Sequence, residues 1–113
     1  MSTDWRHALE RKVSALFASD DERRAARTLL LPVLERVQES ERVAVACLKV
    51  SDGDLERLQE CVRAASTDYR DILAWAESPR QMRIGPGAPA SDQIRARRQD
   101  AEEYARWLRS PQK

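Results

Sequence analysis

Residues 51–79, S-D-G-D-L-E-R-L-Q-E-C-V-R-A-A-S-T-D-Y-R-D-I-L-A-W-A-E-S-P, hold the most regular apolar spacing in the sequence. Side chains three and four positions apart lie along one side of an α-helix. This segment therefore predicts helical structure with one buried face, and the rest of the chain reads in the same way. The apolar residues that follow this spacing are Leu55, Leu58, Val62, Ala65, Tyr69, Ile72 and Ala76.

Polar residues divide the segment into shorter helices. Residues 51–54, S-D-G-D, predict a turn, because Gly53 adopts a positive φ at little cost and the flanking side chains can bond free N–H groups. A helix over 54–65 follows. Ser66, Thr67 and Asp68 then favour a break and a second helix reaching Glu77, since three cap-type residues in mid-helix would compete for backbone bonds. One continuous helix is the alternative, because the apolar spacing is unbroken.

Two further helices are expected before this segment. The first covers residues 1–17, with Asp4 near its start. Ser19 and Glu22 form a capping box, in which the serine accepts from the N–H three residues on and the glutamate reaches back to the serine N–H. The next helix contains Pro32, which kinks or interrupts it. A bent helix over 20–50 is preferred to a short break.

The C-terminal part begins with a linker over residues 79–90, which holds two of the three glycines and three of the five prolines. A last helix over 91–108 follows, capped by Ser91, and its expected apolar stripe is Ile94, Ala101, Tyr104, Ala105 and Leu108. The expected fold is therefore all-α, an irregular antiparallel bundle of four to six helices. Residues 1–78 form its core, residues 79–90 tether the C-terminal region 91–113, and the whole is one domain.

Composition agrees with this fold class. A chain of 113 residues is long enough for one domain with its own core, and 35% charged with 42% apolar residues and three glycines suits amphipathic helices. The sequence contains no apolar run of membrane-spanning length and no signal-peptide core, so we expect a cytoplasmic protein without membrane attachment. Cys47 and Cys61 do not form a metal or disulfide framework; we expect both to be reduced and buried, although the turn at 51–54 could bring them together.

Charge is distributed unevenly along the chain. Residues 51–78 carry three basic against seven acidic residues, a net charge of −4, whereas residues 79–113 carry eight against four, a net charge of +4. The basic region can dock on the acidic one, either in the same chain or in a second copy. Two separately solvated faces explain the pattern equally well.

A short motif lies in the central segment. Gly53, Asp54 and Leu55 are followed at residues 69–77 by Y-R-D-I-L-A-W-A-E. This arrangement resembles a pattern in small uncharacterised bacterial helical proteins, in which a G-D-L helix leads to a helix with aromatic-R-D-aliphatic-L-x-x-A-E. The resemblance covers about residues 51–79. It implies a pair of helices and no activity.

The same motif supplies a candidate ligand or partner contact of four residues: Tyr69, Arg70, Asp71 and Trp75. Arginine can grip an anion beside an aromatic wall, although core packing explains Tyr69 more simply. Asp68 and Asp71 would share a helix face, but a hard divalent ion needs more oxygen ligands. No metal or cofactor is therefore expected.

The arginines of the C-terminal region form a candidate nucleic-acid contact. Arg95, Arg97 and Arg98 can meet phosphates and Trp107 can stack on a base, although acidic residues interrupt this surface. The sequence offers little for catalysis, since His7 is the only histidine and no phosphate-binding loop occurs. The preferred prediction is a non-enzymatic protein–protein interaction module that acts as a homodimer. Nucleic-acid binding is the first alternative, and binding of a small molecule or anion near Arg70 and Trp75 is the second.

Overall fold

The computed structural model describes residues 3–110, and within this range the chain is helical with no strand. Seven helices follow one another: α1 (Trp5–Leu16), α2 (Asp20–Arg36), α3 (Ser40–Ser51), α4 (Leu55–Thr67), α5 (Tyr69–Glu77), α6 (Pro79–Ile84) and α7 (Ala90–Arg109). The all-α prediction is confirmed, and the described range holds one helix more than the four to six expected. Residues 1–2 of the first expected helix, and residues 111–113 of the C-terminal region, lie outside the described range.

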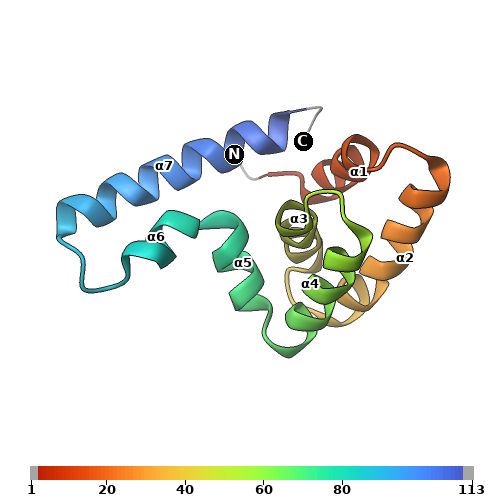
Figure 1. Ribbon diagram of the computed structural model, residues 1–113, viewed down its shortest axis with the longest axis horizontal. Helices are drawn as coiled ribbons and strands as arrows, with labels where there is room; N and C mark the ends of the chain where they lie inside the picture. The colour runs from red at the N-terminus through yellow and green to blue at the C-terminus, as the bar shows by residue number, and fades with distance from the viewer. Residues whose placement is uncertain (1–2, 111–113) are drawn as a thin grey trace.

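Helix α3 forms the centre of the fold. Figure 1 shows it with α1, α2, α4 and α5 around it, and all four contact it. Its residues 43–48, V-A-V-A-C-L, are completely buried. A helix that is apolar on every side is stable only inside a core, because it has no face to offer to water. This uncharged run therefore determines which helix the others surround.

The expected bent helix over 20–50 is wrong. Helix α2 continues through Pro32. Proline has no N–H to donate to the preceding turn, but this side of the helix is exposed to water, as the 47% exposure of the neighbouring Leu31 shows. The chain breaks later, at residues 37–39. There Glu39 has a φ of 51°, in the left-handed region, and its backbone turns the chain into α3. The short break that was the alternative is correct, but its position is not at the proline.

The predicted caps are mostly confirmed. Asp54 accepts from the N–H groups at 56 and 57, as expected. Asp4, expected only as a negative charge near the start of the first helix, in fact caps α1 by accepting from the His7 N–H. Asp68 accepts from the Arg70 N–H, so the helix breaks after Thr67 as favoured. Ser19 accepts from the Glu22 N–H at 3.1 Å; its hydroxyl also donates to the Glu22 carboxylate, in place of the expected bond from the serine N–H.

Half of the expected linker is helical. Residues Pro79–Ile84 form α6, with Pro79 in its first turn, where a missing N–H costs nothing. The loop between α6 and α7 is therefore only residues 85–89. Gln93 holds this loop by donating to the Pro86 and Ala88 carbonyls. Ser91 does not cap α7, because the helix already begins at Ala90.

The expected apolar stripe of α7 is correct at Tyr104, which is buried, and wrong at Ile94 and Ala101, which are exposed. The buried residues of this helix are Ala96, Asp100 and Tyr104, whereas Ile94 is 59% exposed. Ala101 is exposed, and Ala105 and Leu108 are half-buried. Figure 1 shows the cause: the end of α7 nearest the C-terminus lies beside α1, while its first half extends with α6 away from α1–α4. We call α6 and this first half of α7 (residues 79–99) the arm. No described helix is long and apolar enough to cross a membrane.

Candidate functional site

A groove of about 560 Å³ lies between the second half of α7 and the helices α1, α3 and α5. Its apolar lining comes from Ala101, Ala105 and Leu108 of α7 and from Trp5 of α1. Its polar lining includes Arg42, Glu77, Arg97 and Tyr104. We call this feature the α7 groove. Two of the α7 residues that line it, Ala101 and Ala105, have small side chains that leave space beside the larger ones.

One wall of the α7 groove is an ion pair between α3 and α5. Arg42 Nε donates to Glu77 Oε2 at 2.8 Å, and Nη2 donates to Oε1 at 2.5 Å, so the two planar groups meet through two parallel bonds. The Arg42 Nη1 also lies 3.3 Å from both carboxylate oxygens of Glu39. The hydrogen bond to Glu77 is the main reason that the pKa of Arg42 is raised. Arg42 is thus a fixed cation that already has its counter-charge.

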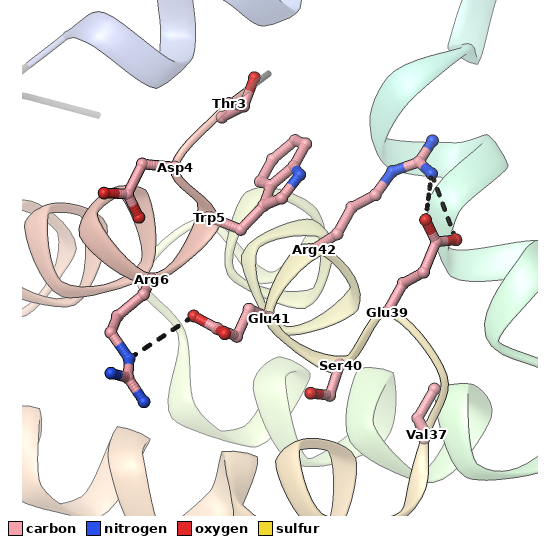
Figure 2. Close-up of a pocket in the computed structure, with 9 residues that line it drawn as sticks. All are labelled: Thr3, Asp4, Trp5, Arg6, Val37, Glu39, Ser40, Glu41 and Arg42. Atoms are coloured by element: carbon pink, nitrogen blue, oxygen red, sulfur yellow. Dashed lines mark hydrogen bonds and ion pairs between the residues drawn. The ribbon is translucent and has the colours of Figure 1, made fainter.

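A second hollow, of about 760 Å³, adjoins the groove at the start of α3. Figure 2 shows the Trp5 ring beside the Arg42 side chain, and Arg42 bonded to Glu39. On the other side, Arg6 Nε lies 3.8 Å from Glu41 Oε2. Three acidic residues (Asp4, Glu39 and Glu41) and two basic residues (Arg6 and Arg42) line this hollow, so its lining carries one more negative than positive charge.

Tyr104 is the unusual group of the α7 groove. It is 8% exposed, and its hydroxyl has no hydrogen-bond partner. Its ring stacks on Trp107 with centroids 5.7 Å apart and also contacts Trp5 at 6.4 Å. Burial raises the pKa of Tyr104, and the negative charge of Glu77 raises it further while Arg42 opposes this. The hydroxyl is therefore a neutral donor whose surroundings include the Arg42–Glu77 pair.

The last turn of α7 is fixed by cationic side chains of α1. Lys12 is completely buried; its Nζ donates to the Ser110 carbonyl at 2.8 Å and lies 4.3 Å from the centre of the Trp107 ring. Arg11 donates to the Arg109 carbonyl at 2.7 Å. Cations at a helix C-terminus satisfy free carbonyls and the helix dipole. Burial and the charge of Arg11 lower the pKa of Lys12.

Sequence reasoning missed Lys12, although a signal was present. It lies three residues after Leu9 and four before Leu16, so helical spacing places it on the buried face of α1.

Asp100 attaches α6 to α7. Its carboxylate is 1% exposed and accepts from the backbone N–H groups of Arg80 and Gln81, each at 3.2 Å. The side chains of the same two residues also donate to it. Ser78, the residue before α6, makes no side-chain hydrogen bond to the start of this helix, so Asp100 of α7 caps it instead. Glu103 adds an ion pair to Arg80.

The structure separates the members of the candidate ligand contact on α5. Tyr69 packs partly against the core. Arg70 is exposed and pairs with its neighbour Asp68, and Asp71 is exposed as well. Trp75 is 61% exposed. None of these four residues lines the α7 groove or the hollow at the start of α3. A ligand site formed by these four residues on α5 stays a prediction.

The members of the candidate nucleic-acid contact differ in the same way. Arg95, Arg97 and Arg98 are exposed on α7, whereas Trp107 is half-buried between the Tyr104 ring and the Lys12 ammonium. All three arginines thus lie on the arm, but Arg97 lines the α7 groove whereas Arg95 and Arg98 do not, and Trp107 lies in the packing between α7 and α1.

Two other groups bear on the chemistry. Cys47 and Cys61 are both buried free thiols, as expected. Among residues 3–110 there is no cluster of three or more His, Cys, Asp or Glu side chains able to hold a metal ion. No known protein family, curated protein or solved structure matches this chain. The function must therefore be argued from the surfaces themselves.

Proposed function

We propose that the protein is a non-enzymatic interaction module that forms a homodimer, in which the exposed face of α5 from one copy packs on the arm of the other. The α5 face consists of Asp71 and Trp75, and the arm face consists of Ile94 and Arg98. Each pair is four residues apart on its helix, so each forms one continuous surface.

The supporting observation is the apolar surface that the single chain leaves uncovered. Trp75 is 61% and Ile94 59% exposed. Met82 and Ile84 of α6 are exposed as well, at 45% and 39%. Single exposed apolar side chains are ordinary, but here four large ones fall within residues 75–94, on one part of the fold. Covering them would supply the hydrophobic term that a stable dimer needs.

Charge supports the choice of a second copy as the occupant. Within residues 3–110, no ion pair joins the acidic segment 51–78 to the basic residues from 79 onward, because Arg80 pairs with Asp100 and Glu103 of its own region. Asp71 on α5 and Arg98 on α7 are both exposed and belong to the oppositely charged regions. A twofold arrangement would bring these two charges together twice, once for each copy.

The test is the mass of the full chain in solution. We expect light scattering at about 50 μM to give twice the chain mass of 13.0 kDa. Trp75→Ser and Ile94→Glu should each give a monomer, because each replaces a large apolar side chain at the centre of the contact with a polar or charged one. Leu31→Ser removes a comparably exposed apolar side chain from α2 and should leave the dimer intact. A wild-type protein that stays monomeric at this concentration contradicts the proposal.

A charge exchange tests the register of the two faces. Asp71→Arg alone and Arg98→Asp alone should each weaken the dimer, because like charges then meet. The double variant should recover most of the loss. Equal effects of single and double variants would rule out the proposed pairing while leaving a dimer of another geometry.

Nucleic-acid binding is the alternative that the three exposed arginines of α7 favour. It predicts retention on mixed DNA or RNA at low salt and release as the salt rises. Arg95→Gln, Arg97→Gln and Arg98→Gln together should abolish that retention. Absence of retention at 50 mM salt would remove this alternative.

A further inference from the structure

The α7 groove has the composition of a small-molecule site. Ligand pockets measure about 300–1,000 Å³ and combine an apolar lining with a few convergent polar groups, and the volume of about 560 Å³ falls within this range. The small side chains of Ala101 and Ala105 leave its floor open, with Trp5 opposite. A row of small residues is not a site in itself, so the polar groups decide the question.

The hydroxyl of Tyr104 is the first of these groups. A buried polar atom without a partner lowers the stability of the fold, and native proteins keep few of them. Tyr104 lines the groove and is more than nine-tenths buried. The charges that act on its hydroxyl are those of Glu77 and Arg42, which line the same groove. The α7 groove therefore contains a donor that the chain itself does not satisfy.

Arg97 is the second group. It lines the groove, is exposed, and has no ion-pair partner among residues 3–110. The other cation of the groove, Arg42, is held by Glu77. The groove thus has one cation available for a ligand. Arg97 and Tyr104 are seven residues apart, so their backbones are separated by about 10 Å along α7.

We propose that the α7 groove binds a small amphipathic monocarboxylate whose carboxylate pairs with Arg97, whose apolar body lies on Ala101, Ala105 and Trp5, and whose far end accepts a hydrogen bond from Tyr104. The ligand class follows from the groove. One available cation selects one negative charge, and the apolar lining selects an aryl or aliphatic body. The unpartnered Tyr104 hydroxyl selects an acceptor at the other end of the ligand.

The test uses three related probes and the indole signals of the full-length protein. The first probe is 4-methoxyphenylacetate, which has the carboxylate, the ring and the distal acceptor. Phenylacetate lacks the acceptor, and 4-methoxyphenylacetamide lacks the charge. In two-dimensional NMR, the indole N–H signal of Trp5 should shift on titration with the first probe. The signal of Trp75, which is exposed on α5 and does not line the groove, should not shift. Both other probes should bind more weakly.

Two variants separate the two polar contacts. Arg97→Gln should weaken 4-methoxyphenylacetate about tenfold and leave the amide unchanged, because only the charged contact is lost. Arg95→Gln removes the same charge two residues away, outside the groove, and should have no effect. Tyr104→Phe should reduce the affinity for 4-methoxyphenylacetate to that for phenylacetate. It should not destabilise the fold, since the hydroxyl bonds to nothing in the chain.

A filled groove provides the remaining control. Ala101→Leu should block all three probes, whereas Ala64→Leu, at an exposed position on α4, should not. No Trp5 shift at 10 mM 4-methoxyphenylacetate, or equal affinity of wild type and Arg97→Gln, would overturn the proposal. Measuring the mass of the same samples keeps this result independent of dimer formation.

Discussion

Asp100 is the single side chain on which the position of the arm depends most. It is 2% exposed, and it accepts from two backbone N–H groups that α6 cannot otherwise satisfy. Asp100→Ala should lower the free energy of unfolding by about 2 kcal/mol, because two part-buried N–H groups of α6 lose their acceptor. Urea denaturation followed by circular dichroism measures this. Glu102→Ala, an exposed acid on the same helix, should cost less than about 0.5 kcal/mol. Similar losses in both variants would contradict the proposed role of the cap.

Cys47 predicts how stability depends on alkaline pH. Burial, helped by the nearby Cys61, raises the pKa of Cys47 from its usual value near 9 to about 12. Between these values the unfolded chain releases the thiol proton and the folded chain keeps it, so the free energy of unfolding falls as the pH rises. The contribution of one such group is about 1.4 kcal/mol per pH unit.

The measurement compares urea midpoints from pH 7.5 to 10.5 under reducing conditions. Cys47→Ala should show a shallower fall above pH 9 than the wild type, even though the smaller side chain lowers its stability at pH 7.5. Val45→Ala creates a cavity in the same helix without removing a titrating group, so its curve should run parallel to the wild type. Parallel curves for all three proteins would mean that the thiol does not contribute.

At the scale of the helices, the connection between α2 and α3 is held in an unfavourable backbone conformation. Glu39 has a φ of 51° and a ψ of 42°, which costs a side-chain-bearing residue about 1 kcal/mol. Glu39→Gly should therefore raise the stability by about 0.5–1 kcal/mol, despite losing a half-exposed contact with Arg42. Thermal or urea unfolding measures this. Gln38→Gly, at a position without a positive φ, should lower it by a similar amount. If Glu39→Gly and Gln38→Gly changed the stability in the same direction, the positive φ of Glu39 would not be the cause.

The same connection shows what the sequence could not reveal about the helices. Caps such as Asp54 and Asp68 were predictable because each bonds an N–H two or three residues away, and a local bond leaves a local pattern. The break at Glu39 contains neither glycine nor proline. Its cause is tertiary, since α3 must turn to bury residues 43–48 on every side. Pro32, the strongest local signal, has no such effect, because its missing bond faces water.

The predicted stripe on α7 was right at Tyr104 but wrong at Ile94 and Ala101 for a related reason. Periodicity selects apolar residues, and it gave Ile94 and Ala101. The buried face instead contains Asp100, because the partner that covers it is the N–H end of α6 and not an apolar surface. Because the Gly/Pro-rich segment contains the short helix α6, whose first N–H groups need an acceptor, the buried face of α7 carries Asp100 at this position.

At the scale of the whole molecule, the α7 groove is built from residues that are 100 positions apart, such as Trp5 and Ala105. No local sequence pattern can predict such a site. The sequence did contain its parts, since Tyr104 and Arg97 were both noted, but for core packing and for nucleic-acid contact. Both lie on α7, and what places them across from Trp5 of α1 is the attachment of α7 to α1 through the Arg11 and Lys12 side chains.

The uneven charge of the chain supplies the last prediction, which concerns the proposed dimer. Its contact pairs a segment of net charge −4 with one of net charge +4, and neither is neutralised by the other within the described chain. Screening shortens from about 10 Å at 0.1 M salt to about 3 Å at 1 M, so exposed charge pairs weaken while apolar contacts do not. Sedimentation equilibrium should therefore give a dissociation constant that rises several-fold between 50 mM and 1 M sodium chloride. The Asp71→Arg, Arg98→Asp double variant should show the same dependence, because it exchanges the charges and keeps their pairing. Trp75→Ser should be monomeric at every salt concentration. A dimer that tightens with salt would be held by apolar contacts alone, and the acidic and basic regions would then be two separately solvated faces.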